Sequence, residues 1–362
     1  MKIAYVARQD GTDMRISKEC NSLLAAGHDV TLVGWDRTPG QQRPDPMPDV
    51  PRRLLLREAS FGPRAVAGSY PAFVGHIARQ LRELRPDIVH CVNEDLAGVA
   101  LALRRRRRFR VVCDLFDSVA LRWSAASRPM RAAADMAARF VHERSDALIA
   151  TDAARAALLR RQAYIVPNYP VDPGPELALT CLPSSGRLRV YVGGTLTRNR
   201  GLSAICTLLD SGLDLQPVTA GWTYDRFASD FTTRPDVEHH GLVTPQQSLQ
   251  VAASCHAILC FYEPSNRNNI MASPNKIYDA MCVGRPVIIS EETLVARWVI
   301  QQGLGYAVPY RDTSALASLI GSFPRGSRTV SETAVRLRSV FETGYSWKVA
   351  EQSLFAAYAS LS

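Results

Sequence analysis

The sequence predicts an α/β fold with two domains, each built on a parallel sheet that helices cover on both faces. The chain has 362 residues, which suggests two domains of about 150 residues or slightly more. In both halves, short apolar runs alternate with amphipathic stretches, the order expected of strands joined by helices. A proline-rich segment at 167–175 separates the halves and is typical of an inter-domain linker.

The first half contains apolar runs bounded by turn residues, which predict strands, and stretches with apolar residues three or four apart, which predict helices. The expected strands are 3–7, 29–33, 87–91, 110–113 and 147–150, and the expected helices are 16–26, 72–84, 96–103, 131–144 and 153–160.

The second half repeats this alternation. The expected strands are 188–192, 215–220, 237–240, 257–261 and 286–289, and the expected helices are 201–209, 245–253, 275–283 and 293–302. We assign residues 1–166 to a Rossmann-like first domain, 167–185 to the linker and 186–344 to a Rossmann-like second domain. Open parallel sheets bind ligands beyond the carboxyl ends of their strands, so two facing domains would hold an active site in the cleft between them.

The composition favours a protein of the cytoplasm with anionic partners. The 43 basic and 34 acidic residues give a net charge of +9, which favours nucleotides, acidic lipid head groups or nucleic acid. The eight cysteines form no C-x-x-C pair, and several lie in apolar runs, as buried thiols of a reducing compartment do. The histidines show no zinc spacing, so we expect no metal site. No apolar stretch is long enough for a membrane span, and the first residues do not form a signal peptide.

The segment from Ala272 to Ile288 is the strongest candidate for a nucleotide site. Ser273 suits an N-cap and Pro274 the first position of a helix, whose free N–H groups favour phosphate. Lys276 in the first turn could reach the same anion, and Asp279, at i+3, could accept hydrogen bonds from a ribose. The alternative interpretation is a capped amphipathic helix with an ordinary ion pair between Lys276 and Asp279.

A second candidate is the glycine-rich segment from Tyr191 to Leu202, in which a strand leads through Gly193-Gly194 into a helix. Glycines allow a phosphate to approach the backbone, and Arg198 or Arg200 could bind it. The segment is neither a Walker A loop nor G-x-G-x-x-G, so a P-loop ATPase or a Rossmann dehydrogenase is not supported. The alternative interpretation is a tight turn with exposed arginines. The loop after the first strand, which contains Gly11, points toward the same expected cleft.

The arginine run Arg104–Arg108 follows a short apolar helix. It is typical of a solvated helix end, and the alternative is contact with an anionic membrane surface, because such clusters attract acidic lipids. Nucleic-acid binding is less favoured, because no aromatic platform or known binding motif accompanies the run.

Several segments in the same order resemble the retaining GT-B glycosyltransferases of family four, especially a bacterial polysaccharide-assembly branch. The matching segments are Asp13-Met14-Arg15, Leu24, Ala26–Val30, Trp35-Asp36-Arg37, Pro86–His90, Asp114–Asp117, Arg144–Ile149, Val166-Pro167-Asn168, Gly194–Gly201, Ser273–Lys276 with Asp279, Gly284–Ile288 and Tyr345-Ser346-Trp347. The sequence departs from the pattern at Met271, where the first of two signature glutamates is usual, and Asp279 matches the second. Thr195 stands at an arginine position, Arg200 at a lysine position and Phe116 at a histidine position.

The resemblance implies transfer of a sugar from a nucleotide-diphosphate sugar to a hydroxyl, with retained configuration and without a metal or other cofactor. It places Lys276 and Arg200 on the diphosphate as the catalytic pair and Asp279 on the ribose, and the closing helix at 345–362 would return to the first domain. Further donor-site candidates are Ser273, Asn275, Gly194, Thr195 and Arg198, and candidates on the acceptor side are Gly11, Arg15, Glu94, Asp114 and Asp117.

The resemblance also implies an acceptor, which is expected to be a glycan or a lipid-linked glycan. The protein is expected in the cytoplasm, and contact of Arg104–Arg108 with an anionic membrane would place it on the inner face of that membrane. Two alternatives remain open. A non-hydrolysing nucleotide-sugar epimerase shares the architecture, and a basic nucleic-acid-binding protein without catalysis would explain the net charge of +9.

Overall fold

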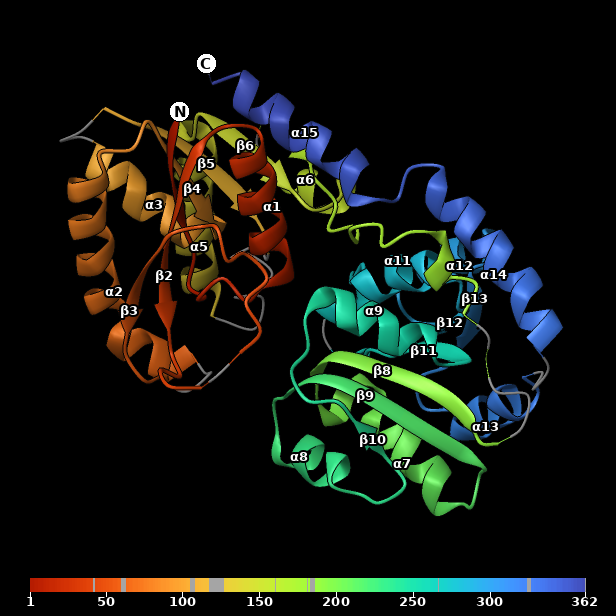
Figure 1. The fold of residues 1–362 in the computed structure, drawn as a ribbon. Helices are drawn as coiled ribbons and strands as arrows, with labels where there is room; N and C mark the ends of the chain where they lie inside the picture. Colours follow the sequence, from red (N-terminus) through yellow and green to blue (C-terminus); the bar gives the residue numbers. More distant parts are fainter. Residues whose placement is uncertain are drawn as a thin grey trace. The chain divides into compact units, whose positions relative to one another are not determined.

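The computed structural model describes residues 1–41, 43–59, 63–104, 108–116, 127–159, 161–180, 182, 186–265, 267–323 and 327–361. The chain forms two compact units (Figure 1). Unit 1 contains Met1–Asn168 and Val349–Ser362, and unit 2 contains Tyr169–Lys348. In the described residues, no helix combines the length and the apolar character that crossing a membrane would need.

Unit 1 is built on a seven-stranded sheet with the order β3-β2-β1-β4-β5-β6-β7, in which every described pair is parallel. Its strands are β1 (Lys2–Val6), β2 (Asp29–Asp36), β3 (Arg52–Leu56), β4 (Ile88–Val92), β5 (Arg110–Leu115), β6 (Ala147–Ala150) and β7 (Tyr164–Ile165). Its helices are α1 (Met14–Ala25), α2 (Pro63–Leu84), α3 (Asn93–Arg104), α5 (Arg128–Arg144) and α6 (Ala153–Ala156), and α15 (Trp347–Ala359) closes the chain.

The core of unit 1 follows from the alternation of side chains along its central strands. Ala4 and Val6 of β1 belong to one buried cluster with Phe73 and Leu81 of α2. On the opposite face of β1, Tyr5 is fully buried and donates a hydrogen bond to Glu19 of α1. A parallel strand with both faces covered must bury both sets of side chains, which explains why these strands are apolar runs without polar alternation.

The last helix packs on the same face of the unit 1 sheet as α1. Tyr358 Oη of α15 lies 2.9 Å from His90 Nδ1 of β4, and Ser22 Oγ of α1 donates to Glu351 Oε2 at 2.7 Å. Leu354, Ala357 and Tyr358 are buried. Residues separated by more than two hundred positions in the sequence therefore share one core.

Unit 2 is built on a six-stranded sheet with the order β10-β9-β8-β11-β12-β13, again with parallel pairs throughout the described residues. Its strands are β8 (Leu188–Leu196), β9 (Leu215–Thr223), β10 (Glu238–His239), β11 (Ala257–Cys260), β12 (Val287–Ser290) and β13 (Gly305–Val308). Its helical segments are η1 (Pro175–Leu177), η2 (Arg198–Leu202), α7 (Ser203–Asp210), α8 (Arg226–Thr232), α9 (Pro245–Ala253), α10 (Arg267–Ile270), α11 (Asn275–Cys282), α12 (Ala296–Gln301), α13 (Thr313–Gly321) and α14 (Ser327–Glu342).

The two faces of the unit 2 sheet carry separate apolar clusters. One cluster joins Tyr191 and Ile258 to Ile277 of α11 and Phe341 of α14. The other joins Val190 and Leu259 to Ile205 of α7 and Leu316 of α13. The predicted fold class, two Rossmann-like α/β units with parallel sheets, is confirmed.

The structure adds elements that the sequence patterns did not predict. Strand β3 has the sequence Arg-Arg-Leu-Leu-Leu and lies at the edge of its sheet, where none of its side chains is fully buried and no clear alternation develops. Strand β13 is also an edge strand. Helix α2 begins at Pro63, nine residues before the predicted start, and α6 ends at Ala156 rather than at Arg160.

A fully buried arginine holds the entry of the chain into unit 2. Arg285 precedes β12, and its guanidinium donates to the carbonyl oxygens of Ala178, Thr180 and Ala253 at 2.6–3.3 Å. These hydrogen bonds fix the segment after η1 against the carboxyl end of α9. Five N–H donors in a planar fork allow one side chain to satisfy several carbonyls at once.

We predict that Arg285→Met lowers the free energy of unfolding by about 3 kcal/mol, because it leaves buried carbonyl groups without donors. Urea unfolding followed by circular dichroism would measure the loss. Arg187→Met is the matched control, since Arg187 is exposed and its pair with Asp214 spans 3.6 Å. An equal effect of the two substitutions would contradict the structural role of Arg285.

Candidate functional site

Helix α11 presents the predicted nucleotide-binding residues at its start. Its N-cap is Pro274, whose side chain makes no capping hydrogen bond, and the first helical residue is Asn275. The prediction of Ser273 as N-cap and Pro274 as first helical residue is therefore wrong by one position. Proline fits the extended N-cap geometry, and Ser273 Oγ lies instead 3.2 Å from Tyr278 Oη. Ser273 and Asn275 are both half-buried.

Lys276 and Asp279 form an ion pair within the first turns of α11. Nζ of Lys276 donates to Oδ2 of Asp279 at 2.8 Å, and the side chains are 14% and 3% exposed. Burial would lower the pKa of Lys276, but the Asp279 carboxylate raises it above its ordinary value, so the ammonium stays charged. The sequence allows an ion pair between Lys276 and Asp279 as the alternative to a nucleotide site, and the structure contains it. The pair keeps the Lys276 ammonium in place near the start of α11.

The glycine-rich end of β8 lies beside this ammonium. A Cβ placed on Gly194 would be 3.9 Å from Cε of Lys276, and Nζ of Lys276 lies 5.6 Å from the ring centroid of Tyr191. Gly194 has φ +93°, and a Cβ on Gly221 of β9 would lie 2.0 Å from its carbonyl oxygen. The exposed backbone of Gly194 is thus one wall of the space next to Lys276.

Arg200 approaches the same region from η2. The backbone turns at Gly201, with φ +89°, where a Cβ would meet Leu259 Cδ2 at 2.6 Å, so only glycine allows this close approach to β11. The Arg200 guanidinium lies 5.0 Å from the ring centroid of Tyr262. Burial raises the pKa of Tyr262, and the charges of Arg200 and Lys276 oppose that rise. Both cations therefore lie at the carboxyl end of β11.

Two other predicted donor residues, Thr195 and Arg198, are exposed. Thr195 lies near the end of β8. The guanidinium of Arg198 lies 5.3 Å from the ring of Phe227, and its backbone N–H donates to Asp225 Oδ2 at 3.0 Å. Unit 2 thus brings together Lys276, Arg200 and the backbone of Gly194, while Arg198 is held toward α8.

In unit 1, the predicted acceptor-side residues Arg15 and Asp114 are buried and paired. The Arg15 guanidinium donates to Asp114 at 3.0–3.3 Å and lies 2.9 Å from Glu19 Oε1. Burial would raise the pKa of Asp114, but Arg15 holds it below its ordinary value. Burial raises the pKa of Glu19 well above its ordinary range. This placement does not favour contact of Arg15 or Asp114 with an acceptor.

The same cluster contains a set of possible metal ligands by residue type. Glu19, His90 and Asp114 each offer a ligand atom, and these atoms lie within 4.8 Å of one another. His90 Nε2 lies 3.4 Å from Glu19 Oε2 and 3.5 Å from Asp114 Oδ2. The guanidinium of Arg15 already supplies the positive charge that two neighbouring carboxyl groups need, so the cluster fits an internal ion pair better than a cation site.

The remaining predicted residues of unit 1 differ in their burial and in their contacts. Gly11, after β1, has φ +99°, and a Cβ there would meet Met47 Cε at 2.2 Å, so the loop requires glycine. Glu94 at the start of α3 is buried, 3.6 Å from His142 Nε2. Asp117 and Arg105–Arg107 lie outside the described residues. Arg104 Nη1 donates to Asp146 Oδ2 at 2.5 Å, and Arg108 is exposed.

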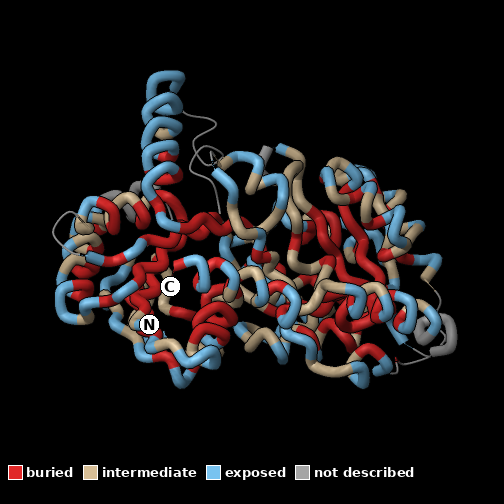
Figure 2. Tube along the Cα trace, turned by 90° about the horizontal axis from the view of Figure 1, so that it is seen from above, coloured by how far each residue is buried: buried red, intermediate tan, exposed pale blue. Residues whose placement is uncertain are grey.

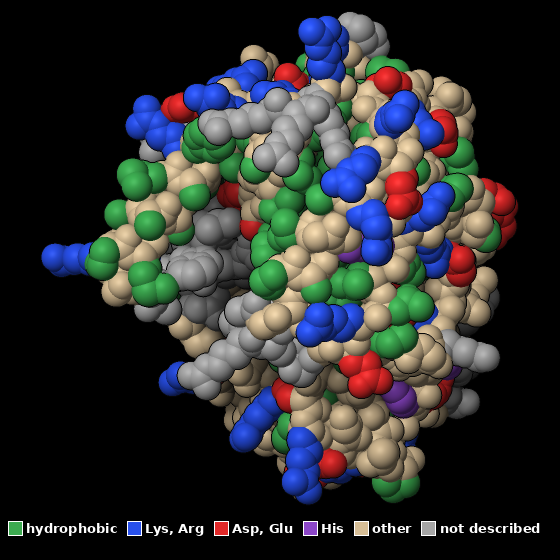
Figure 3. All heavy atoms as spheres, turned by 90° about the vertical axis from the view of Figure 1, so that its left-hand side faces the viewer, with side chains coloured by type: hydrophobic (Ala, Val, Ile, Leu, Met, Phe, Trp, Pro, Cys, Tyr) green, Lys and Arg blue, Asp and Glu red, His purple; other side chains and the backbone are tan. Residues whose placement is uncertain are grey.

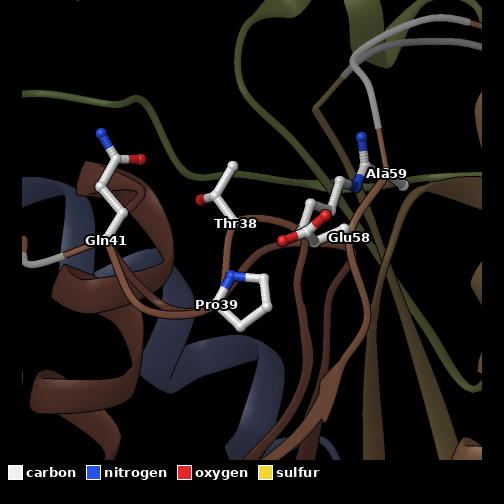
Figure 4. A pocket seen from close by; sticks show the side chains of 6 residues that line it. Thr38, Pro39, Gln41, Glu58 and Ala59 are labelled. Carbon is white, nitrogen blue, oxygen red and sulfur yellow. The ribbon is translucent and has the colours of Figure 1, made fainter.

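A pocket of about 430 Å³ opens in unit 1 where the chain leaves β2 and β3. Figure 4 shows side chains of both segments at its walls. It is lined by Arg37, Thr38, Pro39, Gln41, Glu58 and Ala59. None of these was among the predicted acceptor residues, since β3 was missed and the second wall of the pocket follows that strand. Arg37 stacks on Trp35, with its guanidinium 4.7 Å from the ring centroid.

Comparison of the sequence with protein families gives a match to the Glycosyl transferase 4-like domain over residues 10–174. This range covers most of unit 1 and includes the loop with Gly11 and Arg15. A search of curated protein sequences found no match.

Solved structures resemble the whole chain. A sucrose-phosphate synthase from Thermosynechococcus elongatus superimposes with a TM-score of 0.71 at 17% identity, covering 100% of this chain and 99% of that one. Alr3699/HepE from Anabaena, solved with UDP and glucose, gives 0.69 at 12% identity and covers 99% of this chain and 100% of its own. The fold is GT-B. A trehalose-6-phosphate protein from E. coli, bound with UDP-2-fluoro glucose, gives 0.66 at 10% identity, with coverage of 100% and 99%.

The sequence patterns did not predict several residues that contact the candidate site residues of the two units. Tyr191 and Tyr262 flank the cations of unit 2, yet each lies in or next to an apolar run and looks like core. Glu19 and His90 complete the buried cluster of unit 1. A charged residue on the buried face of a predicted helix, as Glu19 is, was the available signal.

We predict that Asp279→Asn lowers the free energy of unfolding by about 3 kcal/mol, because it leaves the Lys276 ammonium largely buried without its carboxylate. Replacing both partners, as Lys276→Met with Asp279→Leu, should recover most of the loss. Urea unfolding of the single and double variants measures the coupling.

The control is Asp230→Asn in the exposed pair of Arg226 and Asp230, whose side chains are 94% and 72% exposed. That change should cost less than about 0.5 kcal/mol. If Asp279→Asn behaved like this control, the pair of α11 would not be a buried one.

Proposed function

We propose that this protein is a glycosyltransferase that moves a sugar from a nucleotide-diphosphate sugar to a hydroxyl acceptor, with retention of configuration. The observation that carries the proposal is the presence of two cations, Lys276 and Arg200, at the carboxyl end of β11, with the exposed backbone of Gly194 next to Lys276. Ligands of open parallel sheets bind at this edge.

The chemistry follows from the charges. As the bond between the sugar and the diphosphate breaks, negative charge grows on the leaving oxygen. A fixed ammonium from Lys276 and the guanidinium of Arg200 would stabilise that charge, and Asp279 keeps the ammonium protonated and in place. Free N–H groups at the start of α11 add a partial positive charge. No catalytic base is assigned, because in a front-face reaction the leaving phosphate takes the proton from the acceptor.

The comparisons support this proposal from two sides. The match to the Glycosyl transferase 4-like domain lies almost entirely in unit 1, and the candidate donor site lies in unit 2. Two of the similar structures are complexes with UDP or a UDP-sugar analogue. By analogy, a uridine nucleotide is the first donor to test, with Asp279 and Asn275 as candidates for its ribose and phosphates.

The acceptor side of the proposal rests on unit 1. The pocket of Arg37, Thr38, Gln41 and Glu58 combines donors and acceptors of hydrogen bonds, which suits the hydroxyl groups of a sugar. We propose a glycan or a lipid-linked glycan as acceptor, which fits the polysaccharide-assembly branch that the sequence resembles, and a location on the inner face of the membrane.

We predict that Lys276→Ala and Arg200→Ala each reduce transfer from a UDP-sugar by about 10²–10³-fold, because each removes a charge from the leaving diphosphate. Product formation would be followed by chromatography with an oligosaccharide acceptor. Lys348→Ala and Arg226→Ala remove exposed cations of the same unit and should leave turnover unchanged.

Circular dichroism would establish whether each variant is folded. Near-normal transfer by both Lys276→Ala and Arg200→Ala would overturn the assignment of the site. Isomerisation of the donor in the absence of any acceptor would favour the epimerase instead.

A further prediction concerns metal ions. Because the resemblance implies that fixed cations replace a metal at the diphosphate, transfer should continue in excess EDTA at an undiminished rate. Loss of activity that Mg²⁺ or Mn²⁺ restores would contradict this part of the proposal.

A further inference from the structure

Helix α5 carries an apolar face that points away from unit 1. Figure 2 shows this helix standing out from the body of the unit, exposed on nearly all sides along its first turns. Met130, Met136 and Phe140 are 48%, 70% and 44% exposed. In a helix of a globular core, large apolar side chains turn inward, so this exposure needs an explanation.

The spacing of these residues shows that the exposed face is a continuous stripe. Pro129, Ala133, Met136 and Phe140 follow the i, i+4, i+7, i+11 pattern, which places them on one side of a helix. Ala138, Val141 and His142 are the buried residues of α5 and lie on the opposite side. The helix therefore has two apolar faces, and the body of unit 1 covers only one of them.

Basic side chains border the outward stripe. Arg128, Arg139 and Arg144 flank the stripe, whereas Arg131 lies on the opposite side of α5. The Nε of Arg139 donates to Oε1 of the neighbouring Glu143 at 2.8 Å. The guanidinium of Arg144 lies 4.8 Å from the ring of Phe140, at one end of the stripe. In Figure 3, green side chains gather on this projection at the left edge of the view, with a blue one at its tip.

The positive charge of the whole chain is concentrated in the same unit. Unit 1 contains 27 basic and 19 acidic residues, a net charge of +8, whereas unit 2 contains 16 and 15, a net charge of +1. Arg104, the first residue of the arginine run, donates to the carbonyl oxygen of Arg144 at 3.1 Å. The run therefore starts beside the last turn of α5.

We propose that the outward face of α5 (Pro129, Ala133, Met136 and Phe140) binds the surface of an anionic lipid bilayer. Met136 and Phe140 would enter the boundary between head groups and acyl chains, while the arginines pair with lipid phosphates. A second copy of this chain fits the stripe less well. The stripe offers four side chains, far fewer than a stable dimer interface, and two units of charge +8 repel each other.

This inference does not depend on the proposed transfer reaction, so its test measures lipid binding alone. The full-length protein is sedimented with vesicles of phosphatidylcholine, with or without phosphatidylglycerol. The wild type should bind the vesicles that contain phosphatidylglycerol. Met136→Ser with Phe140→Ser should weaken this binding by about tenfold or more, since it removes the side chains that insert.

A matched control separates this face from non-specific binding of exposed apolar side chains, and a second variant tests the contribution of the flanking arginines. Leu56→Ser with Leu294→Ser removes two apolar side chains that are 65% and 68% exposed elsewhere, and should not change binding. Arg128→Gln with Arg139→Gln should weaken binding to anionic vesicles by about fivefold for each arginine.

Three outcomes would overturn the proposal. The first is a wild type whose binding to vesicles does not increase when phosphatidylglycerol is present. The second is a variant with Met136→Ser and Phe140→Ser that binds vesicles as well as the wild type. The third is a dimer of the wild type, measured by light scattering, that becomes a monomer when Met136 and Phe140 are replaced. The stripe would then join two copies of the chain. If glutamine at residues 104–108 abolished binding while the stripe variant did not, the arginine run alone would be the membrane contact.

Discussion

The parallel pairing of all described strands is the constraint on which the rest of the structure depends. In a parallel sheet every strand ends at the same edge, so loops that are distant in sequence meet there. In unit 2 this brings the end of β8, the turn before α7 and the start of α11 to one place, and with them Gly194, Arg200 and Lys276. In unit 1 it brings the ends of β2 and β3 to the walls of one pocket. The chemistry of each unit is thus a property of one sheet edge.

The sequence predicted those elements whose pattern is set by local physics. Buried strands such as β4 and β11 are apolar on both faces, and their runs were found within one residue of their bounds. Strands β3 and β13 were missed in the sequence. Each lies at the edge of its sheet and pairs with a neighbour on one side only, and its side chains have mixed exposure, so no continuous apolar run marks it. The range predicted for α11 begins at the right residue, but the N-cap was assigned one position too early, since proline fits both the N-cap and the first helical position and only the fold decides between them.

For the site residues, too, the sequence predicted only contacts between residues that are close in the chain. The spacing of Lys276 and Asp279 predicted their ion pair, because residues three apart in a helix are neighbours. The pairing of Arg15 with Asp114 joins residues that are 99 positions apart, so no local pattern contains it. Both had been placed among residues that face an acceptor, and burial of both side chains follows from the packing of α1 on β4 and β5. The outward stripe of α5 was visible in the sequence as a periodicity, but the sequence could not show which of its two apolar faces the core would cover.

The discontinuity of unit 1 has a consequence for how the chain is made. Its last residues, Val349–Ser362, pack on a sheet whose strands are complete by residue 165. During translation, the whole of unit 2 must leave the ribosome before α15 can cover Tyr5, His90 and α1. Nascent chains commonly fold domain by domain from the amino terminus, but here the first domain stays unfinished until the last. Ribosome-bound intermediates would therefore expose an uncovered face of unit 1, and loss of the final turns would harm the domain that was synthesised first.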